Sequence, residues 1–241
     1  MDYQNVFERY EYKYFLDPSQ KESLAVEMTG RLRLDSYGRT TIRNIYCDTD
    51  SFRLIRTSLD HPVYKEKLRI RSYQRAAKED MVFVEIKKKF EDIVSKRRVA
   101  MPKTSAEDWI DKRRRMPFRT QITSEIDYML DLYEGIEAKV FLSYEREAYF
   151  AEDGTGLRLT LDENILARDT VLDLGADIWG MPLLPPGITL LEVKIPGAMP
   201  LWMARFLSSN NIRKVSFSKY GAFYKEYLME NKSSERSVFY A

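Results

Sequence analysis

The sequence predicts an α+β fold, in which an antiparallel β sheet curls into a tunnel or barrel with a charged interior and helices pack on its outside. Side chains in an extended strand alternate between two faces, so a pattern of period two separates charged from aliphatic residues. Six stretches of this chain show that pattern, and their charged positions are Arg9/Glu11/Lys13, Lys65/Lys67/Arg69/Arg71, Glu85/Lys87/Lys89, Arg146, Arg158/Thr160/Asp162 and Glu192/Lys194. Because a charged face recurs opposite an apolar face, we expect the sheet to enclose the charges.

The N-terminal half predicts four strands and one helix. We expect a strand from Phe7 to Phe15 and then a helix that starts at the N-cap Asp17 and continues through Leu32. The remaining strands are predicted at 40–48, 62–75 and 81–89.

The C-terminal half continues the alternation of strands and helices. A helical region is predicted from Ser105 to Glu134, with a capping box at Ser105 and Asp108 and a break near Pro117. Strands are predicted at 138–150, 156–162 and 189–195, with a Gly- and Pro-rich loop at 175–187 before the last one. The final helices are predicted at 200–209 and 219–231, followed by a frayed tail.

Composition limits the classes of function. With 241 residues the chain fits one large domain, and its net charge of +2 lacks the excess typical of general nucleic-acid binders. Cys47 and His61 are the only residues of their types, which excludes an intrachain disulfide and any metal centre built from several cysteines or histidines. A hard divalent cation held by carboxylates and phosphate oxygens remains compatible with the sequence.

We find neither a signal peptide nor a membrane-spanning segment in the sequence. Its charged N-terminus has no apolar signal-peptide core, and no stretch approaches the about 20 apolar residues of a membrane span. We therefore expect a cytoplasmic protein.

The alternating strands have two interpretations. One such strand taken alone is more often a half-exposed strand with a solvated charged face. The repetition of Arg-x-Arg and Glu-x-Lys on several strands favours a charged cavity for the whole set. A lining of this kind suits a polyanion together with a metal ion.

The chain resembles a known family in seven ordered segments. They are similar to the signature segments of the vacuolar transporter chaperone (VTC) polyphosphate polymerase domain, a member of the triphosphate tunnel metalloenzymes: FERYEYKY (7–14), YKEKLRIRSY (64–73), VFVEIKKK (82–89), SYEREAY (143–149), LRLTLDEN (157–164), LLEVKIP (190–196) and FSKY (217–220). The resemblance implies one tunnel domain spanning 1–241, with its core at about 7–228 and a flexible tail at 232–241.

The resemblance also implies the residues of the site. The residues that match phosphate- or substrate-binding positions are Lys13, Arg69, Arg71, Lys87, Lys96, Tyr144, Arg146, Arg158, Lys194, Ser218 and Lys219. Glu192 matches the ligand of Mn²⁺ or Mg²⁺, and Glu11 and Glu85 are additional candidates. No separate general base is assigned, because positioning and charge neutralisation can supply most of the catalysis of phosphoryl transfer.

Two positions depart from the family pattern. The wider superfamily opens with E-x-E-x-K, whereas Arg9 replaces the first glutamate here, which places a second metal ligand from this strand in question. Ser216 stands where the eukaryotic polymerases tend to have a lysine, and Lys214 is a candidate replacement. The regulatory SPX domain and membrane helices of the eukaryotic complexes are not part of this sequence.

The expected function is metal-dependent phosphoryl transfer on nucleoside triphosphate and polyphosphate, with polyphosphate synthesis from ATP as the leading reaction. The same site would serve a tripolyphosphatase or nucleoside triphosphatase if water were the acceptor. A non-catalytic module that senses polyphosphate or nucleotide, or that pairs with a membrane protein, is the third hypothesis. The expected partners are ATP or another nucleoside triphosphate, inorganic polyphosphate and pyrophosphate, but not nucleic acid.

Overall fold

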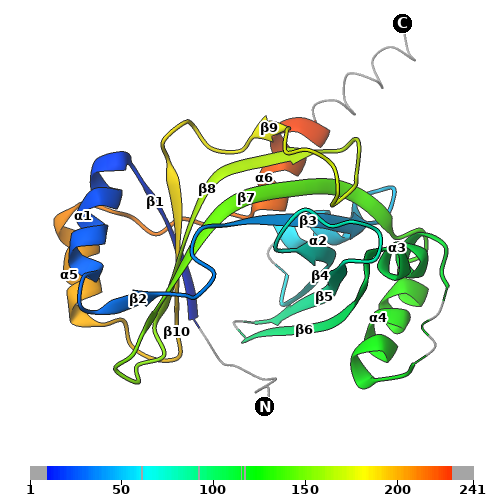
Figure 1. Ribbon diagram of the computed structural model, residues 1–241, viewed down its shortest axis with the longest axis horizontal. Helices are drawn as coiled ribbons and strands as arrows, with labels where there is room; N and C mark the ends of the chain where they lie inside the picture. The colour runs from blue at the N-terminus through cyan, green and yellow to red at the C-terminus, as the bar shows by residue number, and fades with distance from the viewer. Residues whose placement is uncertain (1–9, 61, 92, 115, 117, 230–241) are drawn as a thin grey trace, which may run out of the picture.

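A single antiparallel sheet forms the body of the protein (Figure 1). The computed structural model describes residues 10–60, 62–91, 93–114, 116 and 118–229, so Arg9, His61 and the predicted tail lie outside the described residues. The strands follow the order β1-β10-β8-β7-β3-β4-β5-β6, and β2 pairs with β7 and β9 with β8. Their bounds are β1 (Tyr10–Leu16), β2 (Leu32–Leu34), β3 (Thr40–Asp48), β4 (Tyr64–Ser72), β5 (Met81–Phe90), β6 (Ile93–Pro102), β7 (Glu137–Ala151), β8 (Arg158–Arg168), β9 (Met181–Pro182) and β10 (Thr189–Ile195).

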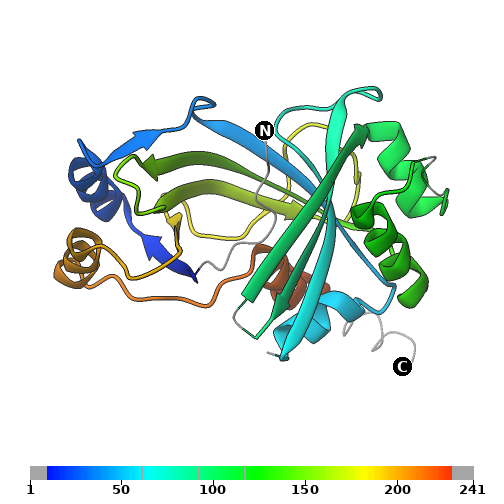
Figure 2. The same ribbon diagram turned by 90° about the horizontal axis from the view of Figure 1, so that it is seen from below.

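The helices lie at the two ends of the sheet and against its middle (Figures 1 and 2). Helices α1 and α5 pack together at one end, whereas α3 and α4 cover the other end. Their bounds are α1 (Pro18–Met28), α2 (Arg53–Leu59), α3 (Lys103–Asp111), α4 (Gln121–Leu132), α5 (Leu201–Ser209) and α6 (Lys219–Phe223), and a π-helical turn, η1 (Tyr224–Leu228), continues α6.

The sheet curls into a tunnel but does not close into a barrel. In the described residues, β1 and β6 end the strand order and share no ladder of hydrogen bonds. Residues 214–215 run along the free edge of β1 instead: Lys214 forms an isolated bridge to Tyr14, and the Val215 amide donates to the Lys13 carbonyl at 2.8 Å. The predicted antiparallel tunnel is confirmed, and this short segment extends its wall beyond β1.

Two apolar clusters cover the outer face of the sheet, as the alternation predicted. One cluster joins β4, β5 and β6 to α3 and α4 around Trp109, and the other joins β1, β8 and β10 to α1 and α5 around Phe206. Leu68, Val84 and Leu191 are fully buried in them. Burial of these side chains, at about 25 cal/mol per Å² of apolar area, holds the helices against the sheet.

The inner face is less uniformly charged than the sequence predicted. A third apolar cluster surrounds α6 and includes Tyr46, Leu142, Leu190 and Phe223, whose parity places the three strand residues on the inside. Helix α6 contacts α2, β7 and β8 there. The charged lining therefore ends where α6 packs into the curl of the sheet.

Several element boundaries differ from the predictions. Helix α1 has the predicted N-cap at Asp17, but it ends at Met28 because Gly30 adopts a φ of 73°, and Leu32 belongs to β2. The expected capping box at Ser105 is wrong, since α3 already begins at Lys103. The box instead lies at Thr120, before α4.

Some elements were not predicted, and each depends on contacts distant in sequence or on an irregular pattern. Helix α2 has only seven residues, and the Asp48 carboxylate accepts hydrogen bonds from the Leu54 and Ile55 amides at 2.9 and 3.0 Å. Strand β6 carries exposed Lys96 and Arg98 at the sheet edge, where charged residues discourage pairing with other chains. Strand β8 also runs six residues beyond the predicted end at Asp162.

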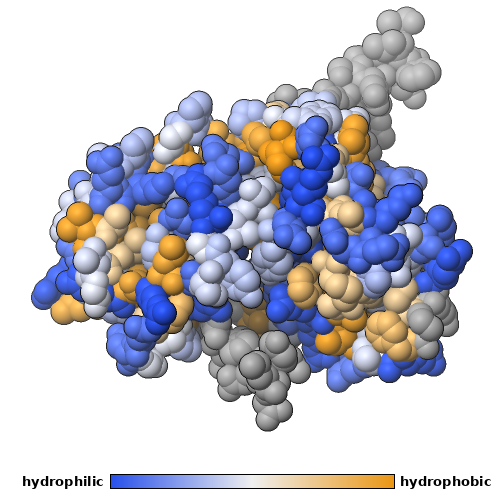
Figure 3. Space-filling view, in the orientation of Figure 1, coloured by the Kyte–Doolittle hydropathy of each residue, from blue (hydrophilic) through white to orange (hydrophobic). Residues whose placement is uncertain are grey.

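The surface is mainly hydrophilic on the side shown in Figure 3, with hydrophobic residues in separate groups. Across the described ranges, none of the helices combines the length and the apolar character that a membrane crossing requires.

Candidate functional site

The inner face of the curled sheet brings the charged positions of seven strands together. Antiparallel pairing sets Lys13 of β1 opposite Glu192 of β10, and it sets Arg69 of β4 opposite Glu85 of β5. Side chains directly opposite each other lie on the same face. The inner face, defined by this parity and by the residues after β10, carries Glu11, Lys13, Lys65, Lys67, Arg69, Arg71, Glu85, Lys87, Lys89, Lys96, Arg98, Arg146, Arg158, Asp162, Glu192, Lys194 and Lys219.

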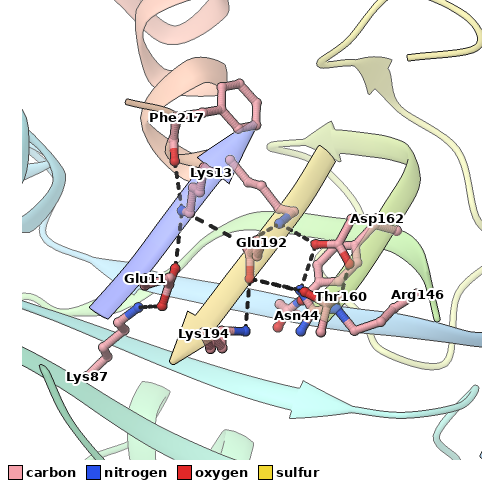
Figure 4. A network of polar contacts seen from close by, with 12 residues as sticks. Glu11, Lys13, Asn44, Lys87, Arg146, Thr160, Asp162, Glu192, Lys194 and Phe217 are labelled. Carbon is pink, nitrogen blue, oxygen red and sulfur yellow. Dashed lines mark hydrogen bonds and ion pairs between the residues drawn. The ribbon is translucent and has the colours of Figure 1, made fainter. Parts of the chain in front are cut away.

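Glu192 lies at the centre of one charged cluster (Figure 4). Its carboxylate oxygens are 3.0 Å from Lys194 Nζ, 3.2 Å from Lys219 Nζ, 3.4 Å from Arg146 Nη2 and 3.8 Å from Lys13 Nζ. Burial acts to raise the pKa of Glu192, but these four cations outweigh it and hold the pKa well below the ordinary range. Glu192 is therefore a buried anion at neutral pH.

Asp162 shares two of these cations. Arg146 donates to its two oxygens at 2.5 and 2.6 Å, and Lys219 Nζ lies 2.6 Å from it. Two-point contact between a guanidinium and a carboxylate fixes both partners in orientation. The candidate residues taken from the sequence omit Asp162, although its parity with Arg158 and Thr160 already placed it on the charged face.

Tyr144 lies between cations of this cluster. Arg146 and Lys219 are 5.0 and 4.6 Å from the centre of its ring, and Arg71 donates to its hydroxyl at 3.3 Å. Burial opposes ionisation of the phenol, yet Arg146, Arg71 and Lys219 lower its pKa below the usual value. The Tyr144 ring therefore separates Arg146, Lys219 and Arg71, and it contacts the first two through cation–π interactions.

Glu85 organises a second charged cluster on β4, β5 and β6. Arg69 donates to it through Nε at 2.8 Å and lies 2.7 Å away through Nη2, while Lys96 lies at 2.7 Å and Arg71 at 3.6 Å. Burial acts to raise the pKa of Glu85, but Arg69, Arg71 and Lys96 hold it below the ordinary range. Its side chain is 1% exposed.

Two uncharged residues of β3 hold the arginines from the other side. Asn44 Oδ1 accepts from Arg71 Nε at 2.9 Å, and the Tyr46 hydroxyl accepts from Arg69 Nη1 at 3.1 Å. These partners were not anticipated from the sequence, although the alternation of 40–48 places both on the inner face. They fix the direction of each guanidinium without cancelling its charge.

A salt bridge joins the two clusters across the tunnel (Figure 4). Glu11 of β1 pairs with Lys87 of β5 at 3.5 Å and with Lys13 at 3.6 Å. Burial acts to raise the pKa of Glu11, but Lys87, Lys194 and Lys13 lower it to about 2. Lys13 Nζ also donates to the Phe217 carbonyl at 2.8 Å, which ties β1 to the segment before α6.

The remaining predicted site residues lie at the margins of these clusters. Arg158 is exposed and is paired in register with Lys194 at the end of β8. Ser218 caps α6, since its hydroxyl accepts from the Gly221 amide at 3.2 Å. Lys214 is exposed and stacks on the outer ring of Tyr12 at 4.8 Å, so it does not replace the lysine expected at Ser216.

The carboxylates differ in their fitness for a divalent cation. Within the described ranges, no three acidic, histidine or cysteine side chains are grouped closely enough to hold a metal ion by themselves. Glu11 and Glu192 nevertheless flank one cation position, because the Lys13 ammonium lies 3.6 Å from one carboxylate and 3.8 Å from the other. Carboxylate oxygens suit Mg²⁺ and Mn²⁺, and phosphate oxygens and water commonly supply the other ligands.

The chain belongs to the VTC domain family, whose family model matches residues 8–227. Curated protein sequences give no match to it.

Solved structures with low sequence identity share the fold. A candidate adenylate cyclase from Bacillus halodurans superposes with a TM-score of 0.55 at 16% identity, covering 89% of this chain and 96% of that one. A candidate adenylyl cyclase from Hippeastrum, described as having a dominant triphosphatase activity, gives a TM-score of 0.52 at 16% identity over 89% of this chain and 94% of that one. A candidate adenylate cyclase from Vibrio parahaemolyticus gives 0.50 at 13% identity over 91% and 99%.

Proposed function

We propose that this protein is a metal-dependent phosphotransferase that acts on nucleoside triphosphate and polyphosphate, and that it synthesises polyphosphate from ATP. The observation that carries the proposal is the convergence of basic side chains from both sides of the sheet on one tunnel. Arg69, Arg71 and Lys96 lie on β4 and β6, Lys13, Arg146 and Lys219 lie on β1, β7 and α6, and the Glu11–Lys87 salt bridge links the two sets. Membership of the VTC domain family supports the same substrate class.

The lining is suited to a chain of phosphates. Arginine grips phosphate oxygens with two parallel hydrogen bonds, whereas lysine acts as a point charge that tolerates several positions along the chain. Arg69, Arg71 and Arg146 are each oriented by a carboxylate, an amide or a hydroxyl before any substrate binds. Because the donors are preorganised, they stabilise the charge of the transferring group without reorganising during the reaction.

We assign a divalent cation, Mn²⁺ or Mg²⁺, to Glu192 and Glu11. When bound, such an ion polarises phosphate oxygens and neutralises developing charge. Glu85 is a weaker candidate, since both of its oxygens are already engaged by Arg69 and Lys96 at 2.7 Å. Lys13 would have to move from between the two carboxylates, and its contact with the Phe217 carbonyl offers it a second partner.

The acceptor decides the reaction. A terminal phosphate oxygen of a growing chain makes the protein a polymerase, and water makes it a hydrolase. Hydrolysis is the second candidate, because a structural neighbour from Hippeastrum is described as a triphosphatase. A cytoplasmic location, a membrane-protein partner and the absence of a nucleic-acid partner remain predictions from the sequence.

Incubation with ATP and Mn²⁺ tests the proposal directly. Products are resolved on a gel stained for polyphosphate, and free phosphate is assayed in parallel, with Glu192→Gln as the background control. Chains that grow with time support the polymerase, and stoichiometric free phosphate without chains supports the hydrolase. Tight binding of ATP or polyphosphate without turnover would contradict both and favour a sensor.

A further inference from the structure

The four inward-facing cations of β4 fall into two pairs with different surroundings. Arg69 and Arg71 are paired with Glu85 and oriented by Tyr46 and Asn44. In the part of the chain that the structure describes, Lys65 and Lys67 form no ion pair, and their hydrogen-bond partners are neutral oxygens.

Lys67 is a cation placed among other cations. Its Nζ donates to Ser218 Oγ at 3.0 Å, and the groups that face it are Lys87 from β5, Lys13 from β1, and Lys65 and Arg69 from its own strand. Burial, followed by repulsion from these four residues, lowers its pKa to about 7. A lysine with a purely structural role would be expected to have a carboxylate partner, because burying an uncompensated charge is costly.

Lys65 continues the same row toward the end of the tunnel. Its Nζ lies 3.4 Å from the Ser58 carbonyl near the end of α2, and it is paired in register with Lys89 of β5. Burial and then the charges of Lys89 and Lys13 lower its pKa. Two lysines of one strand therefore extend the cationic lining beyond the arginines, and among the described residues neither has an acidic partner.

The inward-facing cations of β4 become more exposed from Arg71 toward Lys65. Arg71 is 6% exposed and closed in by Asn44 and Tyr144, whereas Lys65 and Lys67 are half-buried. Strands advance about 3.3 Å per residue, so Lys65 lies about 13 Å along β4 from Arg69. A ligand that reaches from the arginines to Lys65 must be an extended polyanion.

We propose that Lys65, Lys67 and the Ser218 hydroxyl form a distal subsite that binds the phosphates of an inorganic polyphosphate chain beyond the three held near Arg69 and Arg71. The inference rests on the proposed function and adds to it the side of the tunnel through which the chain passes. Phosphate oxygens would take the place that carboxylates occupy around the arginines, and Ser218 would donate its hydroxyl hydrogen while Lys67 turns from it to the phosphate.

The test compares two ligands on the same variants. Affinities for inorganic tripolyphosphate and for long-chain inorganic polyphosphate are measured by calorimetry without nucleotide, for the wild type, Lys67→Met and the double variant Lys65→Met/Lys67→Met. Methionine keeps the unbranched shape and removes the charge. Lys88→Met is the matched control, because Lys88 lies between Lys87 and Lys89 on β5 but pairs with Glu125 on the outer face.

We expect the double variant to lose roughly tenfold or more in affinity for long chains, but less than about threefold for tripolyphosphate. The control should change neither affinity. Equal losses for both ligands would overturn the distal subsite and place these lysines in the triphosphate site, and unchanged long-chain affinity would also overturn it. A wild type that binds neither ligand would instead contradict the proposed function itself.

A second readout separates ligand contact from a structural role. Phosphate contact should raise the pKa of Lys67 from about 7, so that long-chain polyphosphate takes up protons when it binds near neutral pH. The apparent binding enthalpy of the wild type should therefore vary with the ionisation enthalpy of the buffer. That variation should shrink in Lys67→Met, and an unchanged buffer dependence would count against contact between Lys67 and the chain.

Discussion

Glu192 and Glu85 are both buried carboxylates surrounded by cations. They differ in whether those cations also contact a second carboxylate. Three of the four cations around Glu192 have a second carboxylate: Arg146 and Lys219 also contact Asp162, and Lys13 also contacts Glu11. Through the described ranges, the ion pairs of Arg69, Arg71 and Lys96 all end on Glu85.

The contact distances show the same difference. Arg69 holds Glu85 through two nitrogens at 2.8 and 2.7 Å, whereas the contacts of Glu192 range from 3.0 to 3.8 Å and three of its four partners are lysines. Lysine is a mobile point charge, and guanidinium is a rigid fork. We therefore expect Glu192 to exchange partners for the proposed metal ion more readily than Glu85, which fixes the arginines proposed to bind phosphate.

The largest expected effect is on turnover in Glu192→Gln. The amide keeps the shape of the side chain but lacks the anionic oxygens that a hard cation requires, so metal-dependent turnover should fall roughly a hundredfold or more. The fold should persist, because Asp162 and Glu11 still pair with the released cations. Circular dichroism and ATP turnover across a Mn²⁺ titration check both statements, and unchanged Mn²⁺ dependence would move the metal to Glu11 or Glu85.

Glu85→Gln should act on stability instead. Removing the one carboxylate that Arg69, Arg71 and Lys96 share leaves buried cations unpaired, which should lower the free energy of unfolding by about 3 kcal/mol. Denaturant titration of this variant beside Glu192→Gln measures the contrast. If the two variants lost equal stability, the distinction between the two clusters would be wrong.

Removing either arginine should weaken binding rather than folding. Arg69→Ala or Arg71→Ala removes a charge-assisted contact worth roughly 1.5–3 kcal/mol, so affinity for tripolyphosphate should fall about ten- to a hundredfold. Calorimetry with each variant provides the measurement. Wild-type affinity in both would exclude this strand from the phosphate site.

Anions should stabilise the empty protein in order of their charge. A ligand that binds only the folded state adds about 2.7 kcal/mol at a hundredfold excess over its dissociation constant. The melting temperature should therefore rise from sulfate and phosphate through pyrophosphate to tripolyphosphate at equal concentration. Sodium chloride at matched ionic strength should do much less, because screening supplies no bridging oxygens. A flat series would favour a solvated charged face over a binding tunnel.

The last expected effect is on the pH dependence of stability. The folded-state pKa of Lys67 is about 7, below the ordinary value of 10.5, so between these values the unfolded state binds more protons. The free energy of unfolding should rise with pH from about 7 to about 10, and Lys67→Met should flatten that rise whereas Lys88→Met should not. Glu11 affects stability at acidic pH. Its contribution to the free energy of unfolding is complete above pH 4.5 and is lost as the pH falls toward 2.

Local pattern was enough to predict much of the fold. Strands β3 and β10 occupy the predicted residues, and the capping box at Asp17 marks the start of α1. Alternation with a period of two shows which residues share a face of a strand. Burial of one face fixes the register, because a shift of one residue would expose the apolar side chains. For the same reason the sequence already grouped Arg69 with Arg71 and Glu192 with Lys194.

Elements without a regular alternation or helical period were harder to predict. Strand β6 is a charged edge strand, and α2 is held by the Asp48 carboxylate rather than by its own seven residues. Their stability comes from neighbours that are distant in the sequence, and propensity alone does not contain this information.

The sequence by itself determined which charged side chains of each predicted strand share a face, because alternation along one strand requires no knowledge of the other strands. Only the tertiary structure decided how they pair. The curl of the sheet brings Glu11 to Lys87 and places Arg146 and Lys219 between Asp162 and Glu192, across sequence separations that no local pattern records. Which carboxylate shares its cations with other carboxylates, and which lysines have only neutral partners among the described residues, depend on those distances, since electrostatic interaction follows separation in space and burial rather than position along the chain.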